Sequence, residues 1–493
     1  MLKSMINPDQ SGKNKKLLSI SILLFSTLLI FTFSLTANNI SIDGNVTLTE
    51  QNTTSDYTHI KFDISWDNSW RTSSAPNNWD AAWVFAKWKL HSGTEWKHCT
   101  LNTSGHTAPS GSTIDAASDG TGIFIYPNAV GTGSVDWNNA KLRWNYGTDL
   151  VADDATVDVK VFAIEMVYVP QGDFYLGDGS SFNRFHDGDN ASESFQVTSS
   201  QINFGQANNQ LWALGDWDSP TGSLQTDYPT GFAAFYCMKY EISQGQYVGF
   251  LNTLTSTQDN TRYRTMFEND YRHGVWGGSQ GSRFPERPYR ACGFLSWMDG
   301  AAYADWAGLR PMTELEFEKA CRGTQDAVAG EYAWGDVTIT EATTIDADPG
   351  KEYGTETVNG NCNYEWGLEF TGGDEGRGPL RCGIFATGSS TRQQSGASYY
   401  GIMEMSGNLS ERPVTLGNAT GRAFTGNHGN GEIDASGNTD AANWPSTSAE
   451  GSGFRGGNWS YDDSDTRVSD RDDAVWANTD RNSIYGFRAV RTQ

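Results

Sequence analysis

Acidic and aromatic side chains alternate with arginines near the C-terminus, in the segment GGNWSYDDSDTRVSDRDDAVW. Carboxylates at this density can bind a hard cation or act as general acid and base. Carboxylates interleaved with Arg467 and Arg471 are more typical of a solvated, salt-bridged surface. The segment by itself leaves both interpretations open. Its six aspartates are Asp462, Asp463, Asp465, Asp470, Asp472 and Asp473.

The same region has the composition of a recognition surface. Tyr and Trp supply contact area at low entropic cost, and Asp, Asn and Ser adapt their hydrogen bonds to a ligand. We therefore predict that residues 459–485 form a ligand-binding surface. The predicted contact residues are Trp459, Tyr461, Asp463, Asp465, Asp472, Asp473, Trp476, Asp480 and Tyr485.

The cysteines and histidines do not have the spacing of a zinc site. The chain contains no CxxC, HxxxH or HExxH pattern among its six cysteines and seven histidines. In an exported chain the cysteines could form up to three disulfides, but sequence cannot choose among the pairings. Buried thiols are the interpretation we favour. The cysteines are Cys99, Cys237, Cys292, Cys321, Cys362 and Cys382.

The overall composition excludes several classes of protein. With 493 residues the chain is long enough for several domains, and its net charge of -24 argues against nucleic acid as a partner. Aromatic residues make up 13% of the chain, which excludes a disordered polar protein. The 54 glycines predict many tight turns and few long helices.

The N-terminus has the pattern of an export signal. Three lysines, at positions 13, 15 and 16, precede an apolar run over residues 17–35, and Ala37 supplies a small residue for cleavage. We predict a signal peptide over residues 1–37, with an uncleaved membrane anchor as the alternative. In both cases the rest of the chain is expected outside the cytoplasm, secreted, periplasmic or in the cell envelope. Contact with the membrane is expected only through such an anchor.

Residues 38–163 are predicted to form an all-β sandwich of unknown role. Apolar and polar residues alternate over 59–70, 81–90, 122–130, 141–147 and 156–166, between clusters of turn residues. Five tryptophans in this region either fill the core or form a surface that stacks on carbohydrate, and we favour the core. They are Trp66, Trp70, Trp79, Trp83 and Trp88.

Residues 164–493 are predicted to form a second domain with three helices and much irregular structure, so the fold class is α+β. Apolar residues recur at helical spacing over 242–254, 296–308 and 313–323. Ser243 is a predicted N-cap, and Thr313 with Glu316 has the spacing of a capping box.

Six ordered motifs in this second region resemble the formylglycine-generating, sulfatase-modifying factor family. They are EMVYVPQGDFYLG, MKYEISQGQYVGFLN, FLSWMDGAAYADWAGLRPMTELEFEKACRG, GASYYGIMEMSGNLSE, GFRGGNWSYDDSDTRVSDR and YGFRAVR. The resemblance implies a C-type-lectin-like fold for residues 164–493.

The family's oxidase chemistry depends on Cu(I) held by two cysteines shortly after the Gly-Gly segment. The corresponding stretch here holds Tyr461 and Asp465 or Thr466, and no cysteine follows Cys382. Carboxylates and a phenol are hard ligands that do not replace thiolates for Cu(I). We therefore expect no copper and favour a binding protein, leaning against an enzyme. The alternative is a formylglycine-generating or related metal-dependent oxidase that modifies an exported protein or metabolite.

The resemblance also implies structural Ca²⁺. The family's GNxWE segment matches SGNLSE, so the carbonyls of Ser406, Gly407 and Leu409 and the carboxylate of Glu411 would form one oxygen-rich site. A second site would use Asn363, Tyr364 and Asp374. A Gly-Asn turn followed by a solvated glutamate is the alternative interpretation of SGNLSE.

The C-terminal tail is also similar to the variable region of diversity-generating retroelement proteins, which share this lectin-like scaffold. The resemblance implies ligand-contacting positions that differ between copies. The prediction is a calcium-stabilised scaffold that binds an extracellular protein or glycan, with no nucleic-acid partner.

Overall fold

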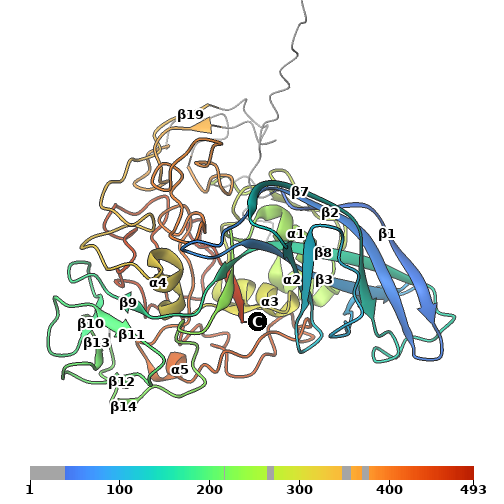
Figure 1. Ribbon diagram of the computed structural model, residues 1–493, viewed down its shortest axis with the longest axis horizontal. Coiled ribbons are helices and arrows are strands. Elements are labelled where there is room, and N and C mark those ends of the chain that lie inside the picture. The colour runs from blue at the N-terminus through green and yellow to red at the C-terminus, as the bar shows by residue number, and fades with distance from the viewer. Residues whose placement is uncertain (1–38, 216, 264–270, 347–356, 369–376, 493) are drawn as a thin grey trace, which may run out of the picture. The chain divides into compact units, whose positions relative to one another are not determined.

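The computed structural model describes residues 39–215, 217–263, 271–346, 357–368 and 377–492 (Figure 1). The predicted signal peptide and the predicted calcium ligand Asp374 lie outside the described residues. In the part of the chain that is described, no helix has the length and apolar character needed to cross a membrane.

Long antiparallel strands dominate residues 39–170. Their bounds are β1 Ser41–Asn52, β2 Tyr57–Arg71, β3 Asp80–Leu90, β4 Lys97–His98, β5 Ser112–Ala116, β6 Ile123–Pro127, β7 Gly131–Trp144 and β8 Val157–Val169. β1, β2 and β7 form one three-stranded sheet. Alternate residues of β2, from Ile60 to Trp66, are buried, as the period of two predicts.

A second sheet packs against the first and continues into the C-terminal region. Its strand order is β18-β21-β15-β8-β3-β6-β5, with β4 beside β3. The added strands are β15 Phe235–Met238, β18 Arg310–Pro311 and β21 Ala489–Thr492. The two-sheet packing agrees with a sandwich, but the position between 163 and 164 lies inside β8 and not in a linker. β8 pairs with β3 on one side and β15 on the other, so both regions share a sheet.

The tryptophans of the first region fill the interior. Trp66, Trp83 and Trp88 are buried, and the partly buried Trp79 stacks on Tyr168 at 4.0 Å between ring centroids. Trp70 packs against a buried cluster that includes residues of α4 and β21. These side chains therefore form core, and not a carbohydrate-stacking surface.

The remaining strands are short and lie among turns. They are β9 Phe174–Leu176, β10 Phe185–Asp187, β11 Phe195–Val197, β12 Asn203–Phe204, β13 Leu211–Ala213, β14 Gly222–Ser223, β16 Val275–Trp276, β17 Phe284–Pro285, β19 Ile345–Asp346 and β20 Thr357–Val358. None exceeds three residues, in keeping with the high glycine content.

The three predicted helices form, with the predicted caps. They are α1 Gln244–Leu251, α3 Trp297–Trp306 and α4 Glu314–Arg322. Ser243 and Thr313 both accept the backbone N–H of the third helical residue, completing capping boxes. Two short helices had not been expected, α2 Ser256–Arg262 and α5 Ala419–Arg422.

All six cysteines are buried free thiols. Burial raises the pKa of Cys237, Cys292 and Cys362, so these side chains are neutral and unreactive at physiological pH. The possible disulfides of the sequence prediction do not form here.

Candidate ligand-binding surface

A network of buried ion pairs supports the C-terminal loops from beneath. Glu314, at the start of α4, accepts hydrogen bonds from Arg471 Nε at 2.7 Å and from Arg455 Nη1 at 3.0 Å. Arg455 also reaches Glu318 at 2.8 Å. The side chains of Glu314, Arg455 and Arg471 are fully buried, so their ion pairs are shielded from water. These ion pairs hold both arginines at the N-terminal end of α4.

Two of the predicted contact residues belong to this support. Trp459 is only 2% exposed and donates its indole N–H to Ser483 O at 3.2 Å. Tyr485 is 3% exposed and packs on Phe454, with ring centroids 4.4 Å apart. Both rings therefore hold the surface in place, and their direct contact with a ligand is limited by burial.

Three exposed aromatic side chains gather around these buried rings. Trp476 is 44% exposed, and the centroid of its ring lies 5.6 Å from that of Phe454. Trp366 is 38% exposed and meets the Trp459 ring edge-on at 4.7 Å. Tyr271 is 37% exposed and lies 5.5 Å from Trp459. Together with Tyr461, which packs partly buried on the same cluster, we call them the aromatic surface.

No pattern in the sequence pointed to Trp366 and Tyr271. Backbone hydrogen bonds attach the first of them to the C-terminal segment: Glu365 N donates to Tyr461 O at 2.7 Å, and Trp366 N to Trp459 O at 3.0 Å. Glu365 and Trp366 both have positive φ, 52° and 63°. Positive φ in non-glycine residues is uncommon, and here it turns the Trp366 ring toward the C-terminal segment only in the folded chain.

The predicted aspartates surround the aromatic surface in different environments. Asp463 accepts the hydroxyl of Tyr332 at 2.9 Å and lies 3.6 Å from Arg467. Asp472 is exposed and accepts from Asn183 Nδ2 at 3.0 Å. Asp480 is exposed, and Asp465 and Asp473 are partly buried.

Crowding of these carboxylates changes their acidity. Burial, followed by repulsion from Asp462 and Asp473, raises the pKa of Asp465 to about 6. Burial also raises the pKa of Tyr461, and Asp473 adds to this effect. Among the described residues no group of three or more His, Cys, Asp or Glu is arranged to hold a metal ion. The aspartates therefore form an acidic border to the aromatic surface.

Asp470→Asn is expected to weaken the pH dependence of stability. Burial, with further repulsion from Asp465, raises the pKa of Asp470 from 3.8 to about 7. Between these values the folded state binds more protons than the unfolded state, so this group's contribution to stability decreases as pH rises, by about 1.4 kcal/mol per unit. Melting temperatures from about pH 4 to about pH 8 would measure the slope, with the exposed Asp480→Asn as control. Equal slopes for wild type and Asp470→Asn would contradict this assignment.

The structure brings the two predicted calcium segments together. Asn408 N donates to Asn363 O at 2.8 Å, and Asn363 Nδ2 donates to Asn408 Oδ1 at 3.2 Å. Gly407 has φ of 78°, and a Cβ there would lie 2.6 Å from Asn363 O. Only glycine fits this close approach. The carbonyls of Ser406 and Tyr364 accept from Cys362 Sγ at 3.2 Å and from Gly367 N at 3.2 Å, respectively.

Glu411 fits a cation through one of its two oxygens. Its Oε1 accepts from Arg488 Nε at 2.7 Å, whereas its buried Oε2 accepts no hydrogen bond from the described residues. A buried carboxylate oxygen without a partner is costly, and a cation is one of the groups that can satisfy it. Burial raises the pKa of Glu411 although Arg488 opposes this effect. The solvated-glutamate alternative is wrong, because Glu411 is 1% exposed.

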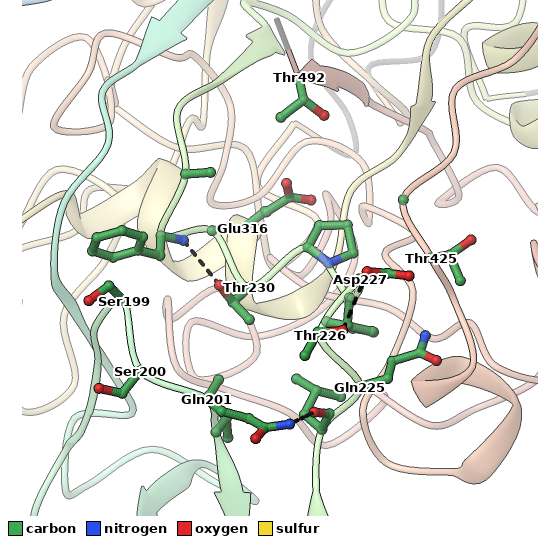
Figure 2. Close-up of a pocket in the computed structure, with 18 of the residues that line it drawn as sticks. Ser199, Ser200, Gln201, Gln225, Thr226, Asp227, Thr230, Glu316, Thr425 and Thr492 are labelled. Atoms are coloured by element: carbon green, nitrogen blue, oxygen red, sulfur yellow. Dashed lines mark hydrogen bonds between the residues drawn. The ribbon is translucent and has the colours of Figure 1, made fainter.

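A separate cavity of about 500 Å³ opens elsewhere in the C-terminal region. Figure 2 shows that its labelled lining comes from several segments, including Ser199 to Gln201, Gln225 to Thr230, Glu316 and Thr492. Glu316 is paired with Arg310 at 2.6 Å, and the rest of the lining mixes hydroxyl and amide groups with apolar side chains such as Ile202, Leu224 and Phe232. None of the predicted contact or calcium residues within the described ranges lines it.

The fold and the surface define a class of protein: an α+β domain with a C-type-lectin-like fold that displays side chains from irregular loops. The chain belongs to the family described as "Sulfatase-modifying factor enzyme 1-like domain", whose model matches residues 153–493. This confirms the resemblance and the fold class drawn from the sequence.

Matches to individual relatives are local. Formylglycine-generating enzyme of Thermomonospora curvata is 46% identical over 55 residues, which is 11% of this chain and 18% of that protein. The formylglycine-generating enzyme of Streptomyces coelicolor is 45% identical over 64 residues, which is 12% of this chain and 19% of that protein. The formylglycine-generating enzyme of Bos taurus is 30% identical over 115 residues, which is 18% of this chain and 31% of that protein. This chain thus spans less than a third of each of these relatives.

Among solved structures, Treponema denticola variable protein 1 aligns with a TM-score of 0.33 and 13% identity. The alignment covers 67% of this chain and 96% of that one.

Proposed function

We propose that this protein is an exported binding protein, in which a calcium-stabilised scaffold of the sulfatase-modifying factor family presents the aromatic surface to an extracellular protein or glycan. The segment expected to direct export, residues 1–37, carries the localisation part of this proposal. Fractionation of the producing cell tests it, and recovery in the cytoplasm with residues 1–37 intact would contradict it.

One observation supports binding more than any other. Among the Trp and Tyr side chains in the described residues, those more than 36% exposed are Tyr271, Trp366 and Trp476, and all three belong to the aromatic surface. Exposed aromatic side chains that converge on one buried cluster are typical of binding sites. The acidic border adds hydrogen-bond acceptors for hydroxyl or cationic groups of a ligand.

The irregular backbone suits a surface that varies. The ion pairs of Glu314 lie beneath the loops, so exposed residues such as Trp476 and Asp472 can change without loss of these ion pairs. We propose that diversification by a retroelement acts on this surface, and the separation of framework and surface is what such diversification would require.

Trp476→Ala is expected to reduce ligand affinity by about tenfold or more, since truncated aromatic anchors commonly cost 2 kcal/mol or above. The probe is a glycan array and a peptide array incubated with the full-length labelled protein, followed by titration of the strongest binders. Trp366→Ala should weaken the same binders, because both rings belong to one surface.

Phe284→Ala is the matched control for these variants. Phe284 is an aromatic residue with 56% exposure in β17, outside the aromatic surface. Binders that are unaffected by Trp476→Ala and Trp366→Ala would place recognition elsewhere. Copper bound in stoichiometric amount, with oxygen consumed in the presence of thiol-containing peptides, would instead favour the oxidase alternative.

We propose in addition that Ca²⁺ binds at Glu411, with backbone carbonyls of Ser406, Gly407 and Leu409. Asn363 and Tyr364 would hold a second ion beside it. The unpartnered Oε2 of Glu411 supports the first site, and the direct contact between Asn363 and Asn408 supports the second. We expect no copper, because the ligands available at Tyr461 and Asp465 are hard.

A further inference from the structure

Three ionisable side chains from distant parts of the sequence meet in the core between the two sheets. Lys239 Nζ lies 3.0 Å from Glu165 Oε2 and 3.4 Å from Asp80 Oδ2. All three side chains are at most 4% exposed. The network lies outside the aromatic surface and the predicted calcium segments, so it serves neither proposal above.

The strand register explains why these side chains meet. β8 lies between β3 and β15, and within it Glu165 pairs with Ala82 of β3 while its carbonyl accepts from Lys239 N at 2.9 Å. Asp80 is two residues from Ala82, so its side chain lies on the same sheet face as that of Glu165. Lys239 follows β15 directly. An amine, a carboxyl and a second carboxyl thus lie side by side on one face.

The surroundings exclude water and are aromatic. Lys239 Nζ lies 4.9 Å from the centroid of the Trp70 ring and 5.4 Å from the centroid of the Tyr240 ring. Trp66 Nε1 donates to Asp80 Oδ2 at 3.0 Å. A dry site of this kind favours condensation of an amine with a carboxyl, because the water released is not replaced.

We propose that Lys239 and Asp80 form an intramolecular isopeptide bond, with Glu165 as the proton carrier, which covalently joins β3 to the chain after β15. The new bond links Lys239 Nζ to Asp80 Cγ, and one molecule of water leaves. No oxidant, reductant or cofactor takes part.

Hydrogen bonds assign the electrophile to Asp80. Its Oδ1 accepts from Ser69 Oγ at 2.7 Å and from Trp70 N at 3.0 Å. Two donors on one carboxyl oxygen stabilise the negative charge that develops there when the amine attacks. The other oxygen, Oδ2, faces Lys239 and leaves as water.

Glu165 accepts the proton that the Lys239 ammonium must lose before the amine can attack. Burial raises the pKa of both Asp80 and Glu165 although the Lys239 ammonium opposes this effect, and the raised pKa favours a proton on one of the two carboxyls. Glu165 removes a proton from the Lys239 ammonium, and the neutral amine attacks the protonated carboxyl of Asp80. Of the three ammonium hydrogens, one stays on the amide nitrogen, one leaves in the water, and one remains on Glu165.

Peptide mapping of the full-length protein tests the bond directly. Trypsin should release residues 72–87, which contain Asp80, joined to residues 185–262, in which cleavage after Lys239 is blocked. The joined species should weigh one water less than the sum of its parts. Glu165 lies in a different peptide, residues 161–184, so fragmentation distinguishes a bond to Asp80 from a bond to Glu165.

Lys319 is the internal control, since it is a buried lysine whose Nζ binds backbone carbonyls, including Gly172 O at 3.3 Å. Trypsin should cut after Lys319 in unfolded protein. Complete cleavage after Lys239, with residues 72–87 free and at full mass, would overturn the proposal, as would a bond from Lys239 to Glu165.

Glu165→Gln separates chemistry from folding. It keeps the size of the side chain but cannot accept the proton, so we expect folded protein without the joined peptide. Lys239→Met and Asp80→Ala should also abolish the joined peptide. A joined peptide that persists in Glu165→Gln at the wild-type level would overturn the role of Glu165. If a variant fails to fold, the wild-type map still decides whether the bond exists.

Discussion

Glu314→Gln is expected to lower the free energy of unfolding by about 3 to 5 kcal/mol, the usual cost of removing one partner from a buried ion pair. Glu314 neutralises Arg455 and Arg471, and all three side chains are fully buried. The substitution keeps the shape but removes the charge, so it leaves guanidinium charge in the interior uncompensated. Denaturant unfolding followed by tryptophan fluorescence measures the change, and stability within 1 kcal/mol of wild type would contradict it.

The same carboxylate predicts sensitivity to acid. Burial is the largest single effect and raises the pKa of Glu314, but the Arg471 and Arg455 guanidinium groups and the Thr415 hydroxyl together outweigh it and lower the pKa from 4.5. A depressed pKa in the folded state contributes stability above the unfolded value, and this contribution is lost as pH falls through the folded pKa. Glu314→Gln should therefore cost less as the pH is lowered below 4.5. Glu95→Gln, at an exposed position, is the matched control and should change stability little at any pH.

Removal of calcium is the second perturbation with a large expected effect. An ion that binds only the folded state stabilises it by about 3 to 4 kcal/mol when its free concentration is about 100 to 1,000 times Kd. We therefore expect chelation to lower the melting temperature of the full-length protein and added Ca²⁺ to restore it. Metal analysis of the purified protein measures the ion directly.

Glu411→Gln should abolish most of this calcium dependence. The variant also disturbs the pair with Arg488, so the relevant readout is the difference between melts with and without chelator, and not the melting temperature itself. Asn363→Ala should remove the share that belongs to the second site. Both sites would be refuted if the purified wild-type protein contains no calcium and its melting temperature does not change when a chelator is added.

Local sequence patterns predicted the elements that are stabilised by neighbouring residues. The capping residues Ser243 and Thr313 start α1 and α4, because a side-chain oxygen satisfies backbone N–H groups only a few residues away. Alternation along β2 predicted which of its residues face the core, since side chains on a strand repeat every two residues. β1, which is largely exposed, lacks that buried stripe, and it was not predicted.

The position of the domain boundary shows where local patterns were insufficient. β8 reads as the last strand of a sandwich, yet it also pairs with β15, which begins 66 residues after β8 ends. Pairing between distant strands depends on the free energy of the whole sheet, and no short segment encodes it.

By itself, the sequence determined the fold class and the family, because ordered motifs and periodicity are properties of neighbouring residues. Tertiary structure alone decided which side chains meet. It buries Trp459, brings Trp366 to the same surface, and places Lys239 beside Asp80, 159 positions away along the chain. Burial and proximity set desolvation and proton affinity, so the chemistry of these groups follows from packing and not from residue type.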